Sequence, residues 1–160
     1  METFISVENS YTGNTILSDG WNAQLFSIDR RKCIYFVQKR TLYSVILLDI
    51  VKQDLKQINS LFFKALVEQL KTDKLYQRSI ELYLYENYSS LRFFKTDNDQ
   101  KTLGTMRDDM ARLTMFIDEA VDKFAGVRKC MNYALNSVPI GTKDYISAKE
   151  LMAEELKTHA

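Results

Sequence analysis

The sequence has a single histidine, His159, which is the last residue but one of the 160. A Ser-His-Asp triad, a Cys-His pair and most zinc sites need a histidine held firmly inside the fold, and a side chain at a chain end is poorly held. The sequence also has no P-loop and no GxGxxG motif. We therefore predict no catalytic residue, no cofactor and no metal ligand, and a protein that is not an enzyme.

Cysteine, proline and glycine are scarce, with two, one and five residues respectively. Two cysteines as far apart as Cys33 and Cys130 do not make a disulfide framework. We expect both to be unbridged and Cys33 to be a small buried apolar residue in a strand. The few glycines and the one proline favour long regular elements joined by few tight turns.

A long apolar run and an excess of one charge are also missing. No run approaches the ~18 residues that a membrane helix needs, and the first residues do not look like a signal peptide, so we expect a cytoplasmic protein. The net charge of +1 disfavours nucleic acid as a partner. With 46% hydrophobic and 27% charged residues, we expect one globular domain over 1–160, with its core at about 20–150 and a short frayed C-terminal tail.

What is present is a strand-rich stretch from Trp21 to Ile50. Three runs rich in β-branched and aromatic residues, Ala23–Ile28, Lys32–Gln38 and Thr41–Ile50, are separated by short charged turns. Neither connection is long enough for a parallel crossover, so we predict an antiparallel meander. The continuous apolar centre of the third run indicates a strand covered on both faces.

Two further short strands are expected, at Met1–Val7 on a sheet edge and at Ser90–Lys95. A polar loop is expected between Glu8 and Gly20, and a turn at 96–100. The predicted fold class is therefore α+β: a small antiparallel β-meander sheet of four to five strands, packed against two long helices, with a C-terminal helix.

The helices follow from apolar residues that recur every three or four positions. They are expected at 51–72, at 75–86, and from 101 to about 125, where Gly126 ends or kinks the helix. Gly104, near the start of the third, would cost about 1 kcal/mol against alanine, which indicates either close approach of another element or a later start. A further helical segment is expected at 127–135. Ser147 and Glu150 have the spacing of a capping box and open the final helix, which runs to about Lys157.

The 101–125 helix carries several carboxylates, which provide the only catalytic alternative. We interpret them as a solvated face on which Asp108 pairs with Arg112 four residues later; a metal site would need carboxylates converging from different elements. The cluster consists of Asp108, Asp109, Asp118, Glu119 and Asp122.

Two groups of residues are candidates for binding a partner. Arg30, Arg31 and Lys32 lie in the first turn of the meander and could meet phosphate or carboxylate; the alternative, which we favour, is that Arg31 pairs with Asp29 or a helix carboxylate and serves structure. The second group is Tyr76, Tyr83 and Tyr85, because tyrosine is enriched at protein interfaces. Burial of these rings is the alternative.

Four motifs in order resemble a known family. They are WxAxLFxxDRR from Trp21, LYSV from Leu42, TLGTM from Thr102 and LNxxP from Leu135. Over about residues 20–150 the chain resembles the small bacterial family described as domain of unknown function 6933. The resemblance implies a compact α+β domain of bacteria, phages or plasmids, and it brings no catalytic residue or ligand with it.

The leading hypothesis is a non-enzymatic interaction or regulatory module of a bacterium or mobile genetic element, which binds a macromolecular partner, most simply a protein. One alternative is a phage-encoded inhibitor of a host defence complex or enzyme. Another is nucleic-acid binding through the Arg30–Arg31 turn.

Overall fold

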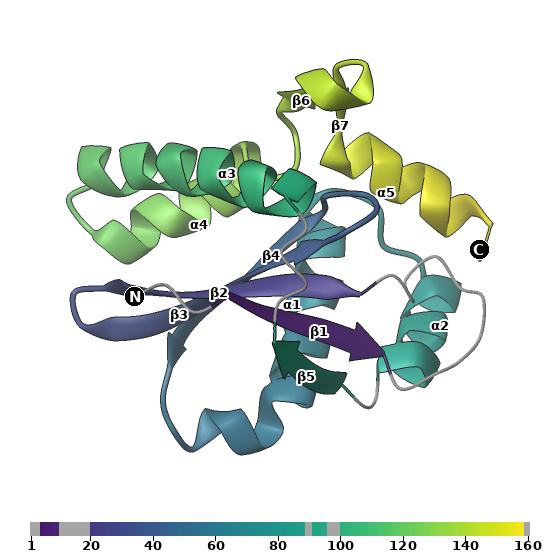
Figure 1. Ribbon diagram of the computed structural model, residues 1–160, viewed down its shortest axis with the longest axis horizontal. Helices are drawn as coiled ribbons and strands as arrows, with labels where there is room; N and C mark the ends of the chain where they lie inside the picture. Colours follow the sequence, from purple (N-terminus) through teal and green to yellow (C-terminus); the bar gives the residue numbers. More distant parts are fainter. Residues whose placement is uncertain (1–3, 10–19, 89–90, 96–99, 159–160) are drawn as a thin grey trace.

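The computed structural model describes residues 4–9, 20–88, 91–95 and 100–158. Its centre is an antiparallel sheet of five strands in the order β4-β3-β2-β1-β5, shown in Figure 1. The strands are β1 (Phe4–Asn9), β2 (Trp21–Ile28), β3 (Arg31–Gln38), β4 (Ser44–Ile50) and β5 (Leu91–Lys95). The predicted α+β class is confirmed, and β2, β3 and β4 form the expected meander.

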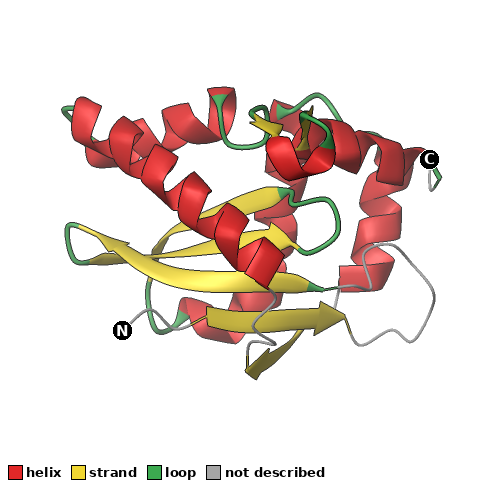
Figure 2. Ribbon diagram, turned by 45° about the horizontal axis from the view of Figure 1, so that its top comes forward, coloured by secondary structure: helices red, strands yellow, loops and turns green. Residues whose placement is uncertain are grey.

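Helices cover both faces of the sheet, as the views in Figure 1 and Figure 2 show. The helices are α1 (Ile58–Thr72), α2 (Arg78–Tyr88), α3 (Gln100–Glu119), α4 (Lys123–Tyr133) and α5 (Ala148–Lys157). Two 3-10 turns, η2 (Asp54–Gln57) and η3 (Gly141–Lys143), and a two-stranded ladder of β6 (Pro139–Ile140) with β7 (Ile146–Ser147) complete the described elements. None of the helices in the described ranges is long and apolar enough to cross a membrane.

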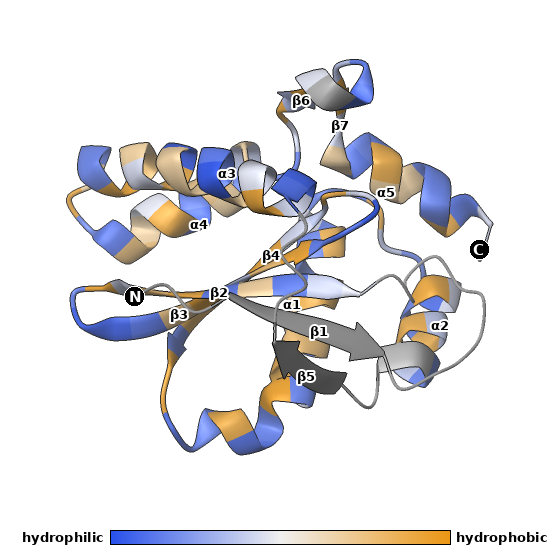
Figure 3. Ribbon diagram, in the orientation of Figure 1, coloured by the Kyte–Doolittle hydropathy of each residue, from blue (hydrophilic) through white to orange (hydrophobic). Residues whose placement is uncertain are grey.

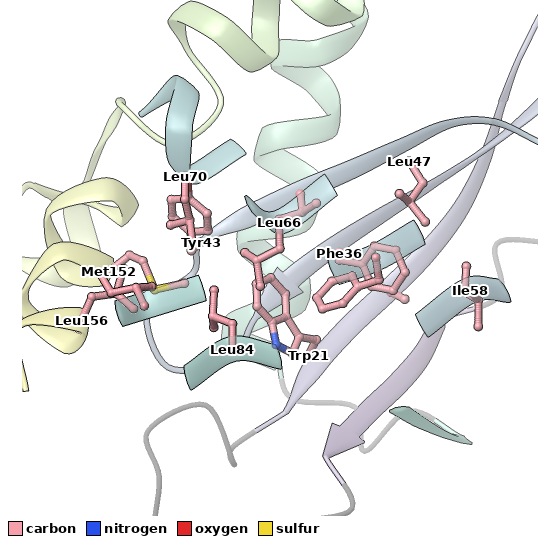
Figure 4. Close-up of a cluster of buried hydrophobic side chains, with 14 residues drawn as sticks. Trp21, Phe36, Tyr43, Leu47, Ile58, Leu66, Leu70, Leu84, Met152 and Leu156 are labelled. Atoms are coloured by element: carbon pink, nitrogen blue, oxygen red, sulfur yellow. The ribbon is translucent and has the colours of Figure 1, made fainter. Parts of the chain in front are cut away.

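The first core lies between the sheet and helices α1, α2 and α5 (Figure 4). Trp21 of β2 meets Phe62 of α1 edge to face, with ring centroids 5.0 Å apart. Phe36 of β3 packs on the same ring at 4.8 Å. Such aromatic pairs add to the burial of apolar area. Trp21, which is 1% exposed, therefore lies in the core.

The second core lies between the opposite face of the sheet and helices α3 and α4. Side chains of a strand alternate between faces, so in β4 Val45 and Leu47 enter the first core while Ile46 enters the second. The prediction that this strand is covered on both faces is confirmed.

The helix predicted at 101–125 is present as α3, but its predicted C-terminal end is wrong, because α3 ends at Glu119 and α4 starts at Lys123. Asp122 caps α4 by accepting a hydrogen bond from the Phe124 amide, and Val121 is fully exposed. Gly126 lies inside α4, where a Cβ would be 2.4 Å from the Phe116 carbonyl oxygen. The two helices approach so closely there that only glycine fits.

Other boundaries also differ. The 51–72 helix begins only at Ile58, because Val51 and Leu55 are exposed and η2 precedes it. Strand β1 lies between β2 and β5, so the prediction of an edge strand there is wrong. The expected strand at 90–95 is present as β5, and the Ser147–Glu150 capping box is confirmed at the start of α5. The loop interior at 10–19, the turn at 96–99 and His159 lie outside the described residues.

Cys33 and Cys130 are both buried and unbridged. Burial raises the pKa of Cys33, and it raises the pKa of Cys130 to about 11. Because the thiolate is the reactive form, we expect both thiols of the folded protein to be alkylated more slowly than a free thiol at the same pH. Unfolding without reductant should release two reactive thiols, as counted by mass spectrometry. A single modified thiol, or none, in unfolded monomer would contradict the structure.

Candidate functional site

The candidate tyrosines Tyr76, Tyr83 and Tyr85 differ in burial. Tyr83 is half-buried and packs against the first core. Tyr76 is also half-buried, its hydroxyl donates to Glu81, and the Lys71 ammonium lies 5.1 Å from its ring centroid. Tyr85 points outward, with 63% of the residue exposed. Of the three candidates, Tyr85 is exposed, whereas Tyr76 and Tyr83 are half-buried and both pack against the first core.

A shallow cavity of about 480 Å³ lies between Tyr76 and Tyr85. Phe63 of α1 also lines it and meets the Tyr85 ring edge to face, with ring centroids 5.8 Å apart. Leu82, 60% exposed, stands beside it, and Arg78 and Glu81 supply opposite charges at the rim. We call this group of six residues the α2 surface. It joins exposed aromatic and aliphatic side chains to a polar rim, as protein-binding sites do.

The sequence reasoning missed four members of the α2 surface: Phe63, Arg78, Glu81 and Leu82. Helical spacing could have found three of them, Arg78, Glu81 and Leu82. Each lies three or four positions from another of them or from Tyr85, so all share one helix face with that tyrosine. Phe63 comes from α1 and has no such signal.

The arginines of the β2–β3 hairpin serve the fold in different ways. Asp29 and Arg30 alone form the turn, both with positive φ, as a two-residue hairpin turn requires. Arg31 belongs to β3, where its Nε donates to Asp49 at 2.8 Å and its guanidinium lies 4.3 Å above the Phe124 ring. Arg31 thus pairs with β4, and not with Asp29 or a helix carboxylate. Asp29 instead accepts from Lys123 at 2.7 Å.

The tip of this hairpin is strongly hydrophilic (Figure 3). Arg30 is exposed there, and the Lys32 ammonium donates to Ser27 at 3.1 Å. Because Arg31 is engaged with Asp49 and Phe124, the three cations do not present one basic patch.

The carboxylates of α3 do not form one solvated face. Asp109 is only 8% exposed and accepts hydrogen bonds from the Tyr35 hydroxyl at 2.5 Å and from Arg112 at 2.7 Å. Burial raises the pKa of Asp109, and the hydrogen bonds from Tyr35 and Arg112 offset part of that rise. The predicted ion pair of Arg112 with Asp108 is wrong, since Arg112 turns to Asp109.

No group of three or more histidine, cysteine or acidic residues placed to hold a metal ion occurs among the residues that the structure describes. Asp109 is surrounded by a tyrosine, a serine and an arginine, all of which donate hydrogen bonds to it. The arrangement satisfies a buried carboxylate, as burial requires, and stabilises the contact of α3 with the sheet.

The fold defines a class: an α+β domain in which helices cover both faces of an antiparallel sheet. A comparison with protein families matches residues 4–151 to the family described as Domain of unknown function (DUF6933). The match covers most of the chain, and the chain belongs to this family. Comparisons with curated proteins and with solved structures give no match.

Proposed function

We propose that the chain is a non-enzymatic interaction module that binds a protein through the α2 surface. The observation that carries this proposal is the exposure of Leu82 and Tyr85, at 60% and 63%, beside the same cavity. Large apolar side chains are common singly on a surface, but a group around a hollow marks a binding site.

The polar rim defines what the partner must offer. Arg78 and Glu81 stand at the rim of the cavity, and Glu81 is held by the Tyr76 hydroxyl. A partner with one aliphatic or aromatic anchor, flanked by a charged group, would fill the hollow and meet the rim. Anchors of this kind carry most of the binding energy in protein interfaces.

Replacing both Leu82 and Tyr85 with aspartate should abolish capture of the partner without unfolding the protein. Both side chains are largely exposed, and surface substitutions usually change stability by within about 0.5 kcal/mol each. The measurement is a quantitative pull-down from cells of the source organism, read by mass spectrometry, with thermal unfolding of each variant.

Arg30→Glu is the matched control, because it introduces an acidic group at an exposed site on the β2–β3 hairpin. A partner that binds the α2 surface is captured by the unmodified protein and by this control, and is lost with the double aspartate variant. If the double aspartate variant still captures every protein that the unmodified protein captures, the α2 surface is not the binding site. If capture of the partner is lost with Arg30→Glu alone, the binding site lies on the β2–β3 hairpin.

A further inference from the structure

A second cavity, of about 510 Å³, lies along the N-terminal part of α3. Figure 1 shows this end of α3 beneath the β6 and η3 segment. The apolar part of its lining comes from the β3–β4 turn, the segment after α4 and the start of α5. These residues are Leu42, Leu135, Val138, Pro139, Ile140 and Ala148. A hollow of this volume, with apolar walls and a few polar groups, suits a small organic ligand.

Gly104 of α3 also lines the cavity, and the described packing gives it no reason to be glycine. The helix begins before it, at Gln100, and a Cβ built on Gly104 meets no atom of the described residues within 4 Å. The close approach expected from the sequence is therefore found at Gly126 and not at Gly104. Glycine weakens a helix relative to alanine. A reason for keeping it is that the space beside its Cα stays open to the cavity.

The polar lining of the cavity includes the buried Asp109 and its partner Arg112, three positions apart on α3. Among the described residues, Asp109 Oδ1 accepts one hydrogen bond, which Arg112 donates at 2.7 Å. A carboxylate oxygen can accept two. Arg112 is half-buried, and this is the one hydrogen bond that it donates within the described part of the chain. Its guanidinium has five N–H donors, so the pair can offer a ligand an acceptor and a donor side by side.

The charged residues in the described lining of the cavity balance one another. Lys101 and Arg112 are basic, and Asp108 and Asp109 are acidic. An anion in the cavity would meet two carboxylates, and a cation would meet two basic groups, and like charges brought together are unfavourable. This balance favours an uncharged ligand that forms hydrogen bonds.

We propose that this cavity binds a small uncharged molecule that carries a primary amide or lactam group on an apolar body. Such a group has a carbonyl oxygen and an N–H on one edge. The oxygen accepts from Arg112, the N–H donates to Asp109 Oδ1, and the apolar body lies over Gly104 against Leu42 and Pro139. This site is separate from the α2 surface and does not depend on the function proposed for that surface.

Benzamide is the probe, and acetophenone is its matched control, because a methyl group of similar size replaces the NH₂ group. Benzoate keeps the aromatic body but is an anion, and acetamide is the amide without that body. Selective ¹⁵N-glycine labelling gives one amide signal for each of the five glycines. We expect benzamide to shift the signals of Gly104 and Gly141, which line the cavity, and to leave Gly126 in place. Benzamide should bind at least about tenfold more tightly than each of the other three compounds.

Two variants separate ligand binding from folding. Gly104→Ala places a methyl group in the open space and removes a glycine that weakens the helix. It should therefore raise the thermal midpoint while weakening benzamide binding at least about tenfold. Arg112→Lys keeps a positive charge beside Asp109 but loses the planar array of donors, so it should also weaken benzamide binding. Met115→Ala, at an exposed position of α3, is the control that should leave binding unchanged.

The proposal is overturned if benzamide leaves the Gly104 and Gly141 signals unshifted at millimolar concentration, or if acetophenone or benzoate binds as tightly as benzamide. It is also overturned if folded Gly104→Ala binds benzamide as the unmodified protein does. Should Gly104→Ala fail to fold, Arg112→Lys decides in its place: unchanged affinity refutes the site, and weakened affinity supports it.

Discussion

Replacing Asp73 with alanine should lower the free energy of unfolding by about 3–5 kcal/mol. Asp73 ends α1, is 4% exposed, and accepts three hydrogen bonds on one carboxylate oxygen. The donors are the Tyr43 hydroxyl at 2.5 Å, the Gln69 amide at 3.1 Å and the Asn136 amide at 3.1 Å. Each buried donor left without its partner costs about 1–3 kcal/mol, and contacting residues do not add fully.

The reason for so large an effect is that Asp73 joins parts of the fold that are far apart in sequence. Asn136 follows α4 and also pairs with the backbone of Ser44, accepting from its amide at 2.8 Å and donating to its carbonyl at 3.0 Å. Its side-chain amide thus satisfies the backbone of Ser44, the first residue of the edge strand β4. Through Asp73 and Asn136, helix α1 on one face is tied to the start of β4 and to the segment that follows α4.

Chemical denaturation measures the loss, with Asp118→Ala, at an exposed site of α3, as the control expected to stay within about 0.5 kcal/mol. A double-mutant cycle of Asp73→Ala with Tyr43→Phe should give a coupling of about 0.5–3 kcal/mol. A loss below about 1 kcal/mol for Asp73→Ala would mean that the three donors find other partners.

Sequence patterns predicted the elements that are determined by residues close to one another in the sequence. The strands of the meander follow from alternation and from β-branched and aromatic residues, and the start of α5 follows from Ser147 and Glu150, which cap each other across three residues. The link between Asp73 and Asn136 spans 63 residues, and no periodicity encodes such a link. The same holds for the pairing of Arg31 with Asp49, because its partner is brought close only by the turn between β3 and β4.

The burial of Asp109 is different, because the sequence did contain a signal for it. Asp109 comes three residues after Met106 and four before Leu113, so helical spacing places it on the buried face of α3. A charged residue is expected at the surface, so the sequence analysis placed Asp109 on the solvated face. The Tyr35 and Ser44 hydroxyls that donate hydrogen bonds to the buried carboxylate come from β3 and β4. The candidate site shows the same contrast. Its tyrosines could be singled out in the sequence, whereas the contribution of Phe63 depends on the packing of α1 against α2.

Leu113→Ala should lower the free energy of unfolding by about 2–5 kcal/mol, as truncation of a buried leucine does. Leu113 is 1% exposed and lies in the second core with Met106, Val127 and Cys130. Gly126 holds α4 against α3 at the distance set by the Phe116 carbonyl, so the backbone cannot move inward to fill the space that the missing methyl groups leave.

Met115→Ala, on the exposed side of the same helix, truncates a residue that is 62% exposed and should change stability by within about 0.5 kcal/mol. Both variants are measured by urea denaturation. Their unfolding free energies are compared on condition that the dependence of that free energy on urea concentration is the same in both. If Leu113→Ala and Met115→Ala cost the same, the face of α3 that packs on the sheet has been assigned wrongly.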